Sequence, residues 1–259
     1  MTGDALQAAV LDLDGTVLRG DESIPGAAEG IAALRSAGLE LVFLTNNPLR
    51  RADEWVRLLG DHGIDADPGA VVTSMDATVA YLREHHAGAT FLPVAGDAIV
   101  EQVREAGFDL TEERDRADVV LAGYDEEFHY DDLLAGLRAM RAGVPLVGTD
   151  PDRWVPTDEG PIPGSGAVVN AVAGAAELEP EAVLGKPSQV TVDLALDRAG
   201  CAPESCLLVG DRLDTDVAMG EQAGMETALV LTGASDGVDG DGPTPDHVLD
   251  SLGEVDRLL

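Results

Sequence analysis

Two aspartates, Asp12 and Asp14, lie two residues apart in the segment DLDGT, directly after an apolar run. Two carboxylates held close together cost free energy unless a metal ion or a shared proton relieves their repulsion. In an extended strand these two positions face the same side of a sheet, whereas Leu13 faces the core. The segment therefore predicts carboxylates for metal binding or acid–base chemistry, with a solvated acidic turn as the alternative.

A second polar segment, Thr45-Asn46-Asn47, also follows an apolar run. It offers a hydroxyl group, side-chain amides and the backbone N–H groups of a helix expected to start at Asn47-Pro48. Backbone N–H groups at a helix N-terminus bind anions. The segment therefore predicts an anion site, and capping of that helix by Asn47 is an alternative compatible with it.

Of the 16 basic residues, Lys186 in the segment GKP is the only lysine. A compact ammonium group suits a phosphoryl oxygen and a carboxylate together better than the flat guanidinium group of arginine does. A surface lysine placed by chance would be equally expected at any exposed position, so its occurrence in this segment favours a functional role.

A third carboxylate, Asp211, stands at the tip of an apolar strand predicted to end in the segment GDRLDTD. It could hold a hard cation together with Asp12, and Asp216 is close enough in sequence to support the metal ligands. Asp214, between them, is expected to do no more than cap a helix.

Short apolar strands alternate with amphipathic helices along the whole chain, which is typical of parallel α/β architecture. In such sheets ligands bind at the carboxyl ends of the strands. A first pattern has strands at 8–13, 40–44, 71–72, 206–210 and 227–231, and helices at 25–38, from 47, from a cap at Ser74, at 188–199 and at 214–223. A second pattern has strands at 90–94, 118–122 and 144–148, and helices at 97–106, 131–142 and 167–178.

The second pattern interrupts the first, which predicts two domains with the middle one inserted into the other. We expect a Rossmann-like, doubly wound core of residues 1–77 and 181–259, with an α/β domain of residues 78–180 inserted into it. Residues 150–166, rich in proline and glycine, are expected to form a loop. Ser251 and Glu254 predict a capping box for the last helix.

The 49 acidic residues give a formal charge of −33, while 45% of the residues are hydrophobic, as in a globular protein. Binding of nucleic acid through this overall field is excluded, and neither a membrane-spanning run nor a signal peptide is expected. Heavy use of Asp and Glu with one lysine resembles proteins of a salt-loaded cytoplasm, where a screening length of about 3 Å at 1 M salt makes such charge tolerable. We therefore expect a cytoplasmic, salt-adapted protein in which Cys201 and Cys206 are free thiols.

The segments DLDGT, LTNN, GKP and GDRLDTD, in this order, resemble the four motifs of the haloacid dehalogenase superfamily. The long α/β insertion between the second and third motifs resembles subclass IIA. That branch includes NagD-like, 4-nitrophenyl phosphate, phosphoglycolate and pyridoxal phosphate phosphatases. The segments AGYDEEFHY, GTDPDRWVPTDEG and PGSGAVV within the insertion are similar to the cap domain of that branch.

This resemblance implies that Asp12 attacks phosphorus to form an aspartyl-phosphate, and that Asp14 protonates the leaving oxygen and then activates water. It implies a Mg²⁺ cofactor held by Asp12, the backbone carbonyl of Asp14, and Asp211. It also implies that Thr45, the region of Asn46, and Lys186 hold the phosphoryl oxygens. The second aspartate argues against dehalogenation.

Two further roles are implied by the same resemblance. Asp216 would position the metal ligands, and Val155, just before a proline of the cap, would take part in choosing the substrate. The resulting expectation is a Mg²⁺-dependent phosphomonoester hydrolase that acts on a small phosphorylated metabolite, such as a sugar phosphate, nucleoside monophosphate, phosphoglycolate or aryl phosphate. A phosphotransferase with the same intermediate and a non-catalytic phosphometabolite-binding protein are the alternatives, and a homodimer through the cap is compatible with each.

Overall fold

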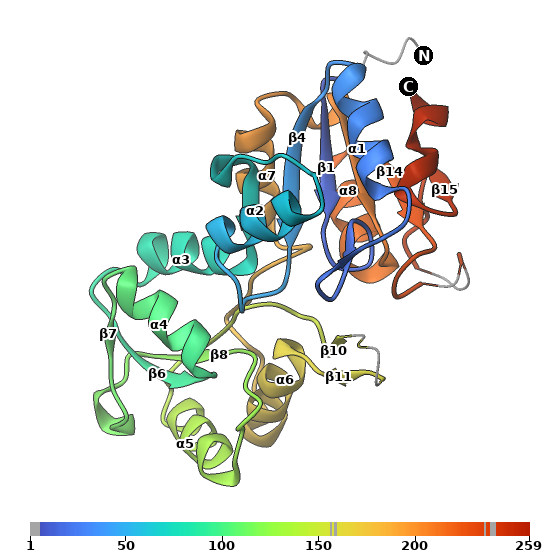
Figure 1. The fold of residues 1–259 in the computed structure, drawn as a ribbon. Coiled ribbons are helices and arrows are strands. Elements are labelled where there is room, and N and C mark those ends of the chain that lie inside the picture. Colours follow the sequence, from blue (N-terminus) through green and yellow to red (C-terminus); the bar gives the residue numbers. More distant parts are fainter. Residues whose placement is uncertain (1–5, 156, 158–159, 236, 239–241) are drawn as a thin grey trace. The chain divides into compact units, whose positions relative to one another are not determined.

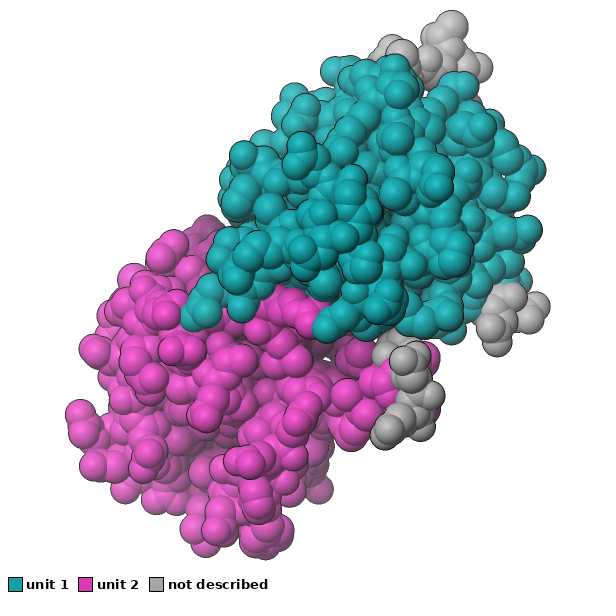
Figure 2. All heavy atoms as spheres, in the orientation of Figure 1, with its two compact units in different colours: residues 1–45, 51–72, 186–259 teal, residues 46–50, 73–185 magenta. Residues whose placement is uncertain are grey.

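The computed structural model describes residues 6–155, 157, 160–235, 237–238 and 242–259. By its internal contacts the chain divides into two compact units, coloured separately in Figure 2. The first unit comprises residues 1–45, 51–72 and 186–259, and the second comprises residues 46–50 and 73–185. The divisions at 72/73 and 185/186 differ from the expected 77/78 and 180/181, and the short segment 46–50 belongs to the second unit.

The first unit is built on a six-stranded sheet in the order β15-β14-β13-β1-β4-β5 (Figure 1). Strand β1 pairs in parallel with both β13 and β4, and β14 pairs in parallel with β13 and β15. All five residues of β1 are buried, as expected for the centre of a parallel sheet covered on both faces. The strands are β1 (Ala8–Asp12), β4 (Glu40–Thr45), β5 (Val71–Thr73), β13 (Cys206–Gly210), β14 (Glu226–Val230) and β15 (His247–Leu249).

Helices cover both faces of this sheet because alternate residues of β1 point to opposite sides. Ala9 and Leu11 pack with the apolar side chains of α1, α2 and the final 3₁₀ helix, whereas Ala8 and Val10 pack with those of α7 and α8. The helices are α1 (Ala27–Ser36), α2 (Ala52–Asp61), α7 (Gln189–Ala199), α8 (Ala218–Ala223) and the 3₁₀ helix Leu252–Leu258; β2 (Leu18–Arg19) and β3 (Glu22–Ser23) form a small hairpin.

The second unit has its own five-stranded sheet, in the order β12-β9-β8-β6-β7. All strand pairings within this sheet are parallel. Side chains of α5 and α6 pack on one face of this sheet and form a separate apolar core. The elements are α3 (Ser74–His85), β6 (Thr90–Val94), α4 (Asp97–Glu105), β7 (Asp109–Leu110), β8 (Val119–Ala122), α5 (Tyr130–Arg141), β9 (Leu146–Gly148), α6 (Ser165–Ala176) and β12 (Ala182–Val183). The predicted α/β fold class with parallel sheets is therefore confirmed.

Several local predictions need correction. The helix expected at Asn47 begins at Ala52, because the Asn47 side chain accepts a hydrogen bond from the backbone N–H of Leu49 and closes a local turn instead. The N-cap of α3 is Thr73 rather than Ser74, since the Thr73 hydroxyl accepts from the backbone N–H of Asp76. The Ser74 hydroxyl donates to the carbonyl of Asn46.

Two further differences lie outside the two large sheets. The region 150–166 is not wholly a loop, because β10 (Trp154–Val155) and β11 (Ile162–Pro163) pair antiparallel within it. The expected capping box of the last helix is absent, since Ser251 makes no side-chain cap hydrogen bond and Glu254 accepts from the backbone N–H of Asp250. Within the described part of the chain, no helix is long and apolar enough to cross a bilayer.

Candidate active site

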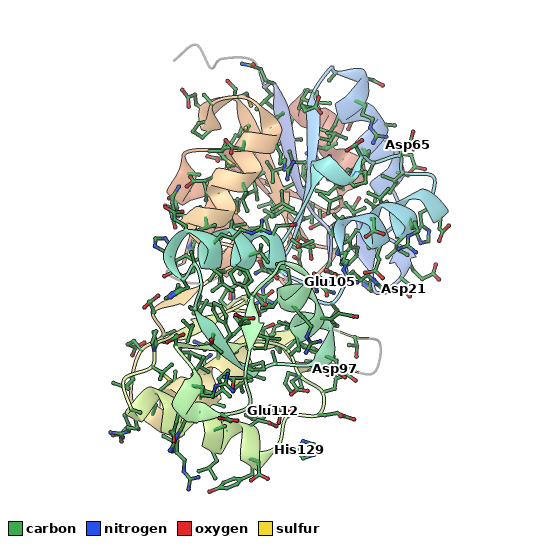
Figure 3. All side chains as sticks on the ribbon, turned by 90° about the vertical axis from the view of Figure 1, so that its left-hand side faces the viewer. Asp21, Asp65, Asp97, Glu105, Glu112 and His129 are labelled. Carbon is green, nitrogen blue, oxygen red and sulfur yellow. The ribbon has the colours of Figure 1, made fainter. Side chains whose placement is uncertain are left out.

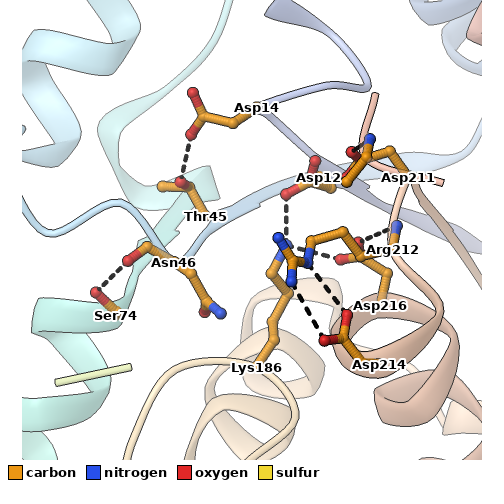
Figure 4. Close-up of polar contacts among 11 residues, drawn as sticks. Asp12, Asp14, Thr45, Asn46, Ser74, Lys186, Asp211, Arg212, Asp214 and Asp216 are labelled. Atoms are coloured by element: carbon orange, nitrogen blue, oxygen red, sulfur yellow. Dashed lines mark hydrogen bonds and ion pairs between the residues drawn. The ribbon is translucent and has the colours of Figure 1, made fainter. Parts of the chain in front are cut away.

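Two neighbouring strands of the first unit bring Asp12 and Asp211 to the same edge of the sheet. Asp12 is the last residue of β1, and Asp211 follows the last residue of β13. The two strands pair in parallel, with Leu11 opposite Val209, so their carboxyl ends lie together. Figure 4 shows both side chains close to Lys186, which lies just before the N-terminus of α7.

The ammonium group of Lys186 lies between two carboxylates. Its Nζ donates to Oδ1 of Asp12 and, at 2.7 Å, to Oδ1 of Asp216. All three side chains are buried, and a buried charge is tolerated only when it is paired and hydrogen-bonded. Burial by itself lowers the pKa of Lys186, but the charges of Asp12 and Asp216 outweigh burial and hold that pKa above its ordinary value.

Asp216 is held at both of its carboxylate oxygens. Oδ1 accepts from Lys186, and Oδ2 accepts from the backbone N–H of Arg212 at 3.1 Å. The side chain also requires glycine at position 210, since a Cβ there would overlap the Asp216 carboxyl group. Asp216 is therefore placed to orient the lysine.

Asp211 is 2% exposed and fits between two glycines. A Cβ at Gly15 or at Gly233 would overlap its carboxyl group, and Gly15 also has a positive φ of 97°, which favours glycine. Its Oδ2 accepts from the backbone N–H of Ala234. Burial, together with the charge of Asp216, raises the pKa of Asp211 to about 7.

The donor set fits a hard divalent cation. One carboxylate oxygen from each of Asp12, Asp211 and Asp216 lies within 4.8 Å of the other two. Oδ2 of Asp12 is buried and, among the described residues, has no hydrogen-bond partner. Burial raises the pKa of Asp12 well above its usual range, and the charges of Asp216 and Asp211 add to this against the effect of Lys186. A cation bound by oxygen ligands would relieve both the repulsion and the unsatisfied oxygen.

Asp14 lies outside the strand, because β1 ends at Asp12. Its Oδ2 accepts a hydrogen bond of 3.0 Å from the hydroxyl of Thr45, the last residue of β4. Leu13 is fully buried in the core, as expected. The two aspartates thus have different partners: Asp12 contacts Lys186, and Asp14 contacts Thr45 (Figure 4).

The other predicted residues lie apart from this cluster or outside its unit. Asn46 and Val155 belong to the second unit, where Val155 pairs with Ile162 in the β10–β11 hairpin. Asp214 is exposed and binds the guanidinium group of Arg212, with 3.1 Å between Nε and Oδ1, so it does not act as the expected helix cap.

Sequence reasoning missed four supporting positions. Gly210, Gly233 and the backbone N–H groups of Arg212 and Ala234 surround the carboxylates of Asp211 and Asp216. Gly210 stands directly before Asp211 in the motif segment and could have been noticed there. Gly233 carries no such signal, since it lies in a glycine-rich stretch far from the motif.

Two family models match the chain. Residues 9–109 match haloacid dehalogenase-like hydrolases, and residues 183–255 match a HAD-hydrolase-like family. The sugar-phosphatase AraL of Bacillus subtilis is 35% identical over 250 residues, which is 96% of this chain and 92% of that protein. The acid sugar phosphatase of Staphylococcus epidermidis is 34% identical over 229 residues, 88% of each chain. The chain belongs to the haloacid dehalogenase-like hydrolases.

Solved structures agree with this membership along the whole length. This haloacid dehalogenase-like hydrolase superposes on p-nitrophenyl phosphatase from Archaeoglobus fulgidus with a TM-score of 0.88 and 29% identity, covering 99% of this chain and 100% of that one. NagD from Escherichia coli K-12 gives a TM-score of 0.84 and 28% identity over 97% and 98% of the two chains. The hydrolase is therefore similar to the NagD and nitrophenylphosphatase-like group.

The matched regions of this haloacid dehalogenase-like hydrolase coincide with the cluster. Asp12, Asp14 and Thr45 fall in the first matched region, and Lys186 and Asp211 fall in the second, as does Asp216. Residues 110–182, which neither family model covers, all belong to the second unit. The buried carboxylates and the lysine thus belong to the part of the chain that the family models describe.

Proposed function

We propose that this protein is a phosphatase that hydrolyses small phosphomonoesters through an aspartyl-phosphate on Asp12. The observation that carries the proposal is the position of Lys186, whose ammonium group lies between Asp12 and Asp216 in a buried cluster that also contains Asp211. The names of the relatives, which include sugar phosphatases and a p-nitrophenyl phosphatase, support the same class of reaction.

In the first step, a carboxylate oxygen of Asp12 attacks the phosphorus atom of the substrate. A bond from this oxygen to phosphorus forms while the bond from phosphorus to the ester oxygen breaks. Asp14, in its protonated form, donates its proton to the departing oxygen, which leaves as an alcohol. Without substrate, the hydrogen bond from Thr45 holds the Asp14 carboxyl group in place.

In the second step, Asp14 accepts a proton from water as that water attacks the phosphorus atom of the aspartyl-phosphate. The bond between phosphorus and the Asp12 oxygen breaks, inorganic phosphate leaves, and both aspartates return to their starting states. One carboxyl group thus serves as acid in the first step and as base in the second.

The oxygen donors fit Mg²⁺, with Asp12, Asp211 and the backbone carbonyl of Asp14 as the proposed ligands. When bound, the ion would offset the repulsion between the anionic nucleophile and the anionic phosphate. Asp216 is the poorer ligand of the three clustered carboxylates, because both of its oxygens already accept hydrogen bonds.

We propose that Lys186, Thr45 and the region of Asn46 hold the phosphoryl oxygens. The ammonium group of Lys186 is held in the buried cluster by its contacts with Asp12 and Asp216. Its positive charge can there stabilise the negative charge that develops on a phosphoryl oxygen.

The proposed substrate class is a small phosphorylated metabolite, with sugar phosphates first, because AraL and the acid sugar phosphatase are the relatives of highest identity quoted above. The second unit, including Val155, is proposed to act as the cap that selects the organic group. We also propose that the protein is cytoplasmic and forms a homodimer through this unit.

The deciding experiment measures phosphate release with Mg²⁺ in molar KCl, using sugar phosphates, nucleoside monophosphates, phosphoglycolate and 4-nitrophenyl phosphate. Asp12→Asn should abolish release, whereas the matched control Asp214→Asn, at an exposed position, should retain it. Alcohol added as an acceptor distinguishes transfer from hydrolysis. An inert wild type that binds the esters would overturn the catalytic proposal and favour a binding protein.

A further inference from the structure

The two cysteines of the chain lie in direct contact at the turn between α7 and β13. The Sγ atoms of Cys201 and Cys206 are 3.1 Å apart, and both residues are free thiols. Cys206 is fully buried, whereas Cys201 is partly exposed. Neither residue belongs to the proposed catalytic cluster.

The local backbone imposes this approach. Helix α7 ends at Ala199, and its C-cap Gly200, with a positive φ of 67°, turns the chain into Cys201. The 3₁₀ turn Pro203–Ser205 then returns the chain, and Cys206 opens β13. The Cys206 thiol also contacts the carbonyl of Ala202 at 3.6 Å. The pair is thus held by a turn anchored at both ends in regular structure.

We propose that Cys201 and Cys206 form a redox site, which a small disulfide compound such as glutathione disulfide oxidises reversibly to an intramolecular disulfide. This site is distinct from the phosphatase chemistry and does not depend on it.

The exchange proceeds in two balanced steps. The thiolate of Cys201 attacks one sulfur of the oxidant, so that a mixed disulfide forms and one glutathione thiolate leaves. Cys206 then loses its proton to solvent and attacks Sγ of Cys201, which forms the internal disulfide and releases the second glutathione thiolate. Two protein thiols are oxidised, and one glutathione disulfide is reduced to two thiols.

The difference in burial sets the order of these steps. Burial and the contact with Cys201 raise the pKa of the Cys206 thiol to about 12, so the more accessible Cys201 is the residue that meets the oxidant. Helix α7 starts close to Lys186, and β13 ends beside Asp211. The disulfide would therefore join the C-terminal end of α7 to the N-terminal end of β13, and these ends lie away from the catalytic residues.

The test exposes the folded protein to glutathione disulfide, alkylates the remaining thiols, and cleaves the denatured, unreduced chain after Glu204. That cleavage separates the two cysteines in sequence. We expect the two fragments to stay linked until dithiothreitol is added. The folded protein should also be oxidised more readily than the urea-unfolded chain, because the native turn preorganises the pair. The measure is the ratio of the squared glutathione concentration to the glutathione disulfide concentration at which half of the protein is oxidised. We expect this ratio to be at least about tenfold higher for the folded protein.

Single variants test the order of steps. Cys206→Ser, or Cys206→Ala if the serine variant does not fold, should trap a stable glutathione adduct on Cys201. Cys201→Ser should leave the buried Cys206 unmodified. A stable adduct without cross-linking in the wild type, disulfide-linked dimers, two alkylated thiols after oxidation, or equal ratios for the folded and unfolded chains would each overturn the proposal.

Discussion

The carboxyl group of Asp211 fills the position that a Cβ at residue 233 would take, so the missing side chain of Gly233 is what allows Asp211 to lie beside Asp12 and Asp216. The same carboxylate accepts from the backbone N–H of Ala234, the next residue. A loop far from the motif in sequence therefore shapes the proposed metal site through its backbone alone.

Gly233→Ala should displace the Asp211 carboxylate and weaken Mg²⁺ binding by about 10–100-fold, the usual cost of disturbing groups that orient metal ligands. Isothermal titration with Mg²⁺ measures this directly. Gly60→Ala is the matched control, because a Cβ at this helical position meets nothing within 4 Å. Unchanged Mg²⁺ affinity in Gly233→Ala would show that Asp211 is not a ligand.

Lys186→Met should lower the free energy of unfolding by about 3–5 kcal/mol in the absence of divalent ions, since it leaves two buried carboxylates without their cation. Urea unfolding at pH 8 with a chelator measures the change. Adding Asp216→Asn to this variant should recover part of the loss, because one of the uncompensated charges is then removed. Wild-type stability in Lys186→Met would contradict the proposed pairing.

Asp150 offers a pH prediction that does not involve the catalytic cluster. Burial, with the charge of Asp152, raises the pKa of Asp150 from 3.8 to about 8. The folded protein therefore holds a proton that the unfolded chain has lost between these values, so this residue makes the fold less stable as the pH rises from about 4 to about 8.

Asp150→Asn should remove this contribution while keeping an acceptor for the backbone N–H of Asp152. The stability of the variant relative to wild type should increase with pH across that window and level off above it, as measured by urea unfolding at a series of pH values. The exposed Asp197→Asn serves as the control. A difference that does not vary with pH would show that Asp150 ionises normally.

We expect the charge of −33 to make the stability of the fold depend on salt concentration. Screening at 1 M KCl confines repulsion to about 3 Å, whereas at 0.01 M it extends to about 30 Å. We expect far-UV circular dichroism to show loss of secondary structure when KCl is lowered from molar to millimolar. An identical spectrum at both concentrations would refute salt adaptation as the reason for the acidity.

The alternation of strands and helices could be predicted because each element carries a local signal. β1, for example, is a run of apolar residues ending at Asp12, and α7 is capped by Ser188, whose hydroxyl accepts from the backbone N–H of Thr191. The proximity of Asp12 and Asp211 could also be predicted, since the carboxyl ends of parallel strands lie at the same edge of a sheet. Roles for these residues remain predictions until the variants are measured.

Contacts that depend on distant packing could not be predicted. Nothing local indicates that Gly233 must be small, because the reason is a carboxylate from another loop. The helix expected at Asn47 was wrong because the asparagine side chain competes with helical hydrogen bonding by closing its own turn. The contact of Cys201 with Cys206 depends on how the turn after Gly200 closes, which their spacing does not define.

The place of β1 in its sheet bears on how the chain is made. One edge of β1 pairs with β4, which follows soon after it, but the other pairs with β13, which is synthesised only after the whole second unit. We therefore expect a growing chain to present the unpaired edge of an apolar strand while the second unit, which has its own sheet and core, is already complete. During translation, this edge of the nascent first unit would need protection from aggregation.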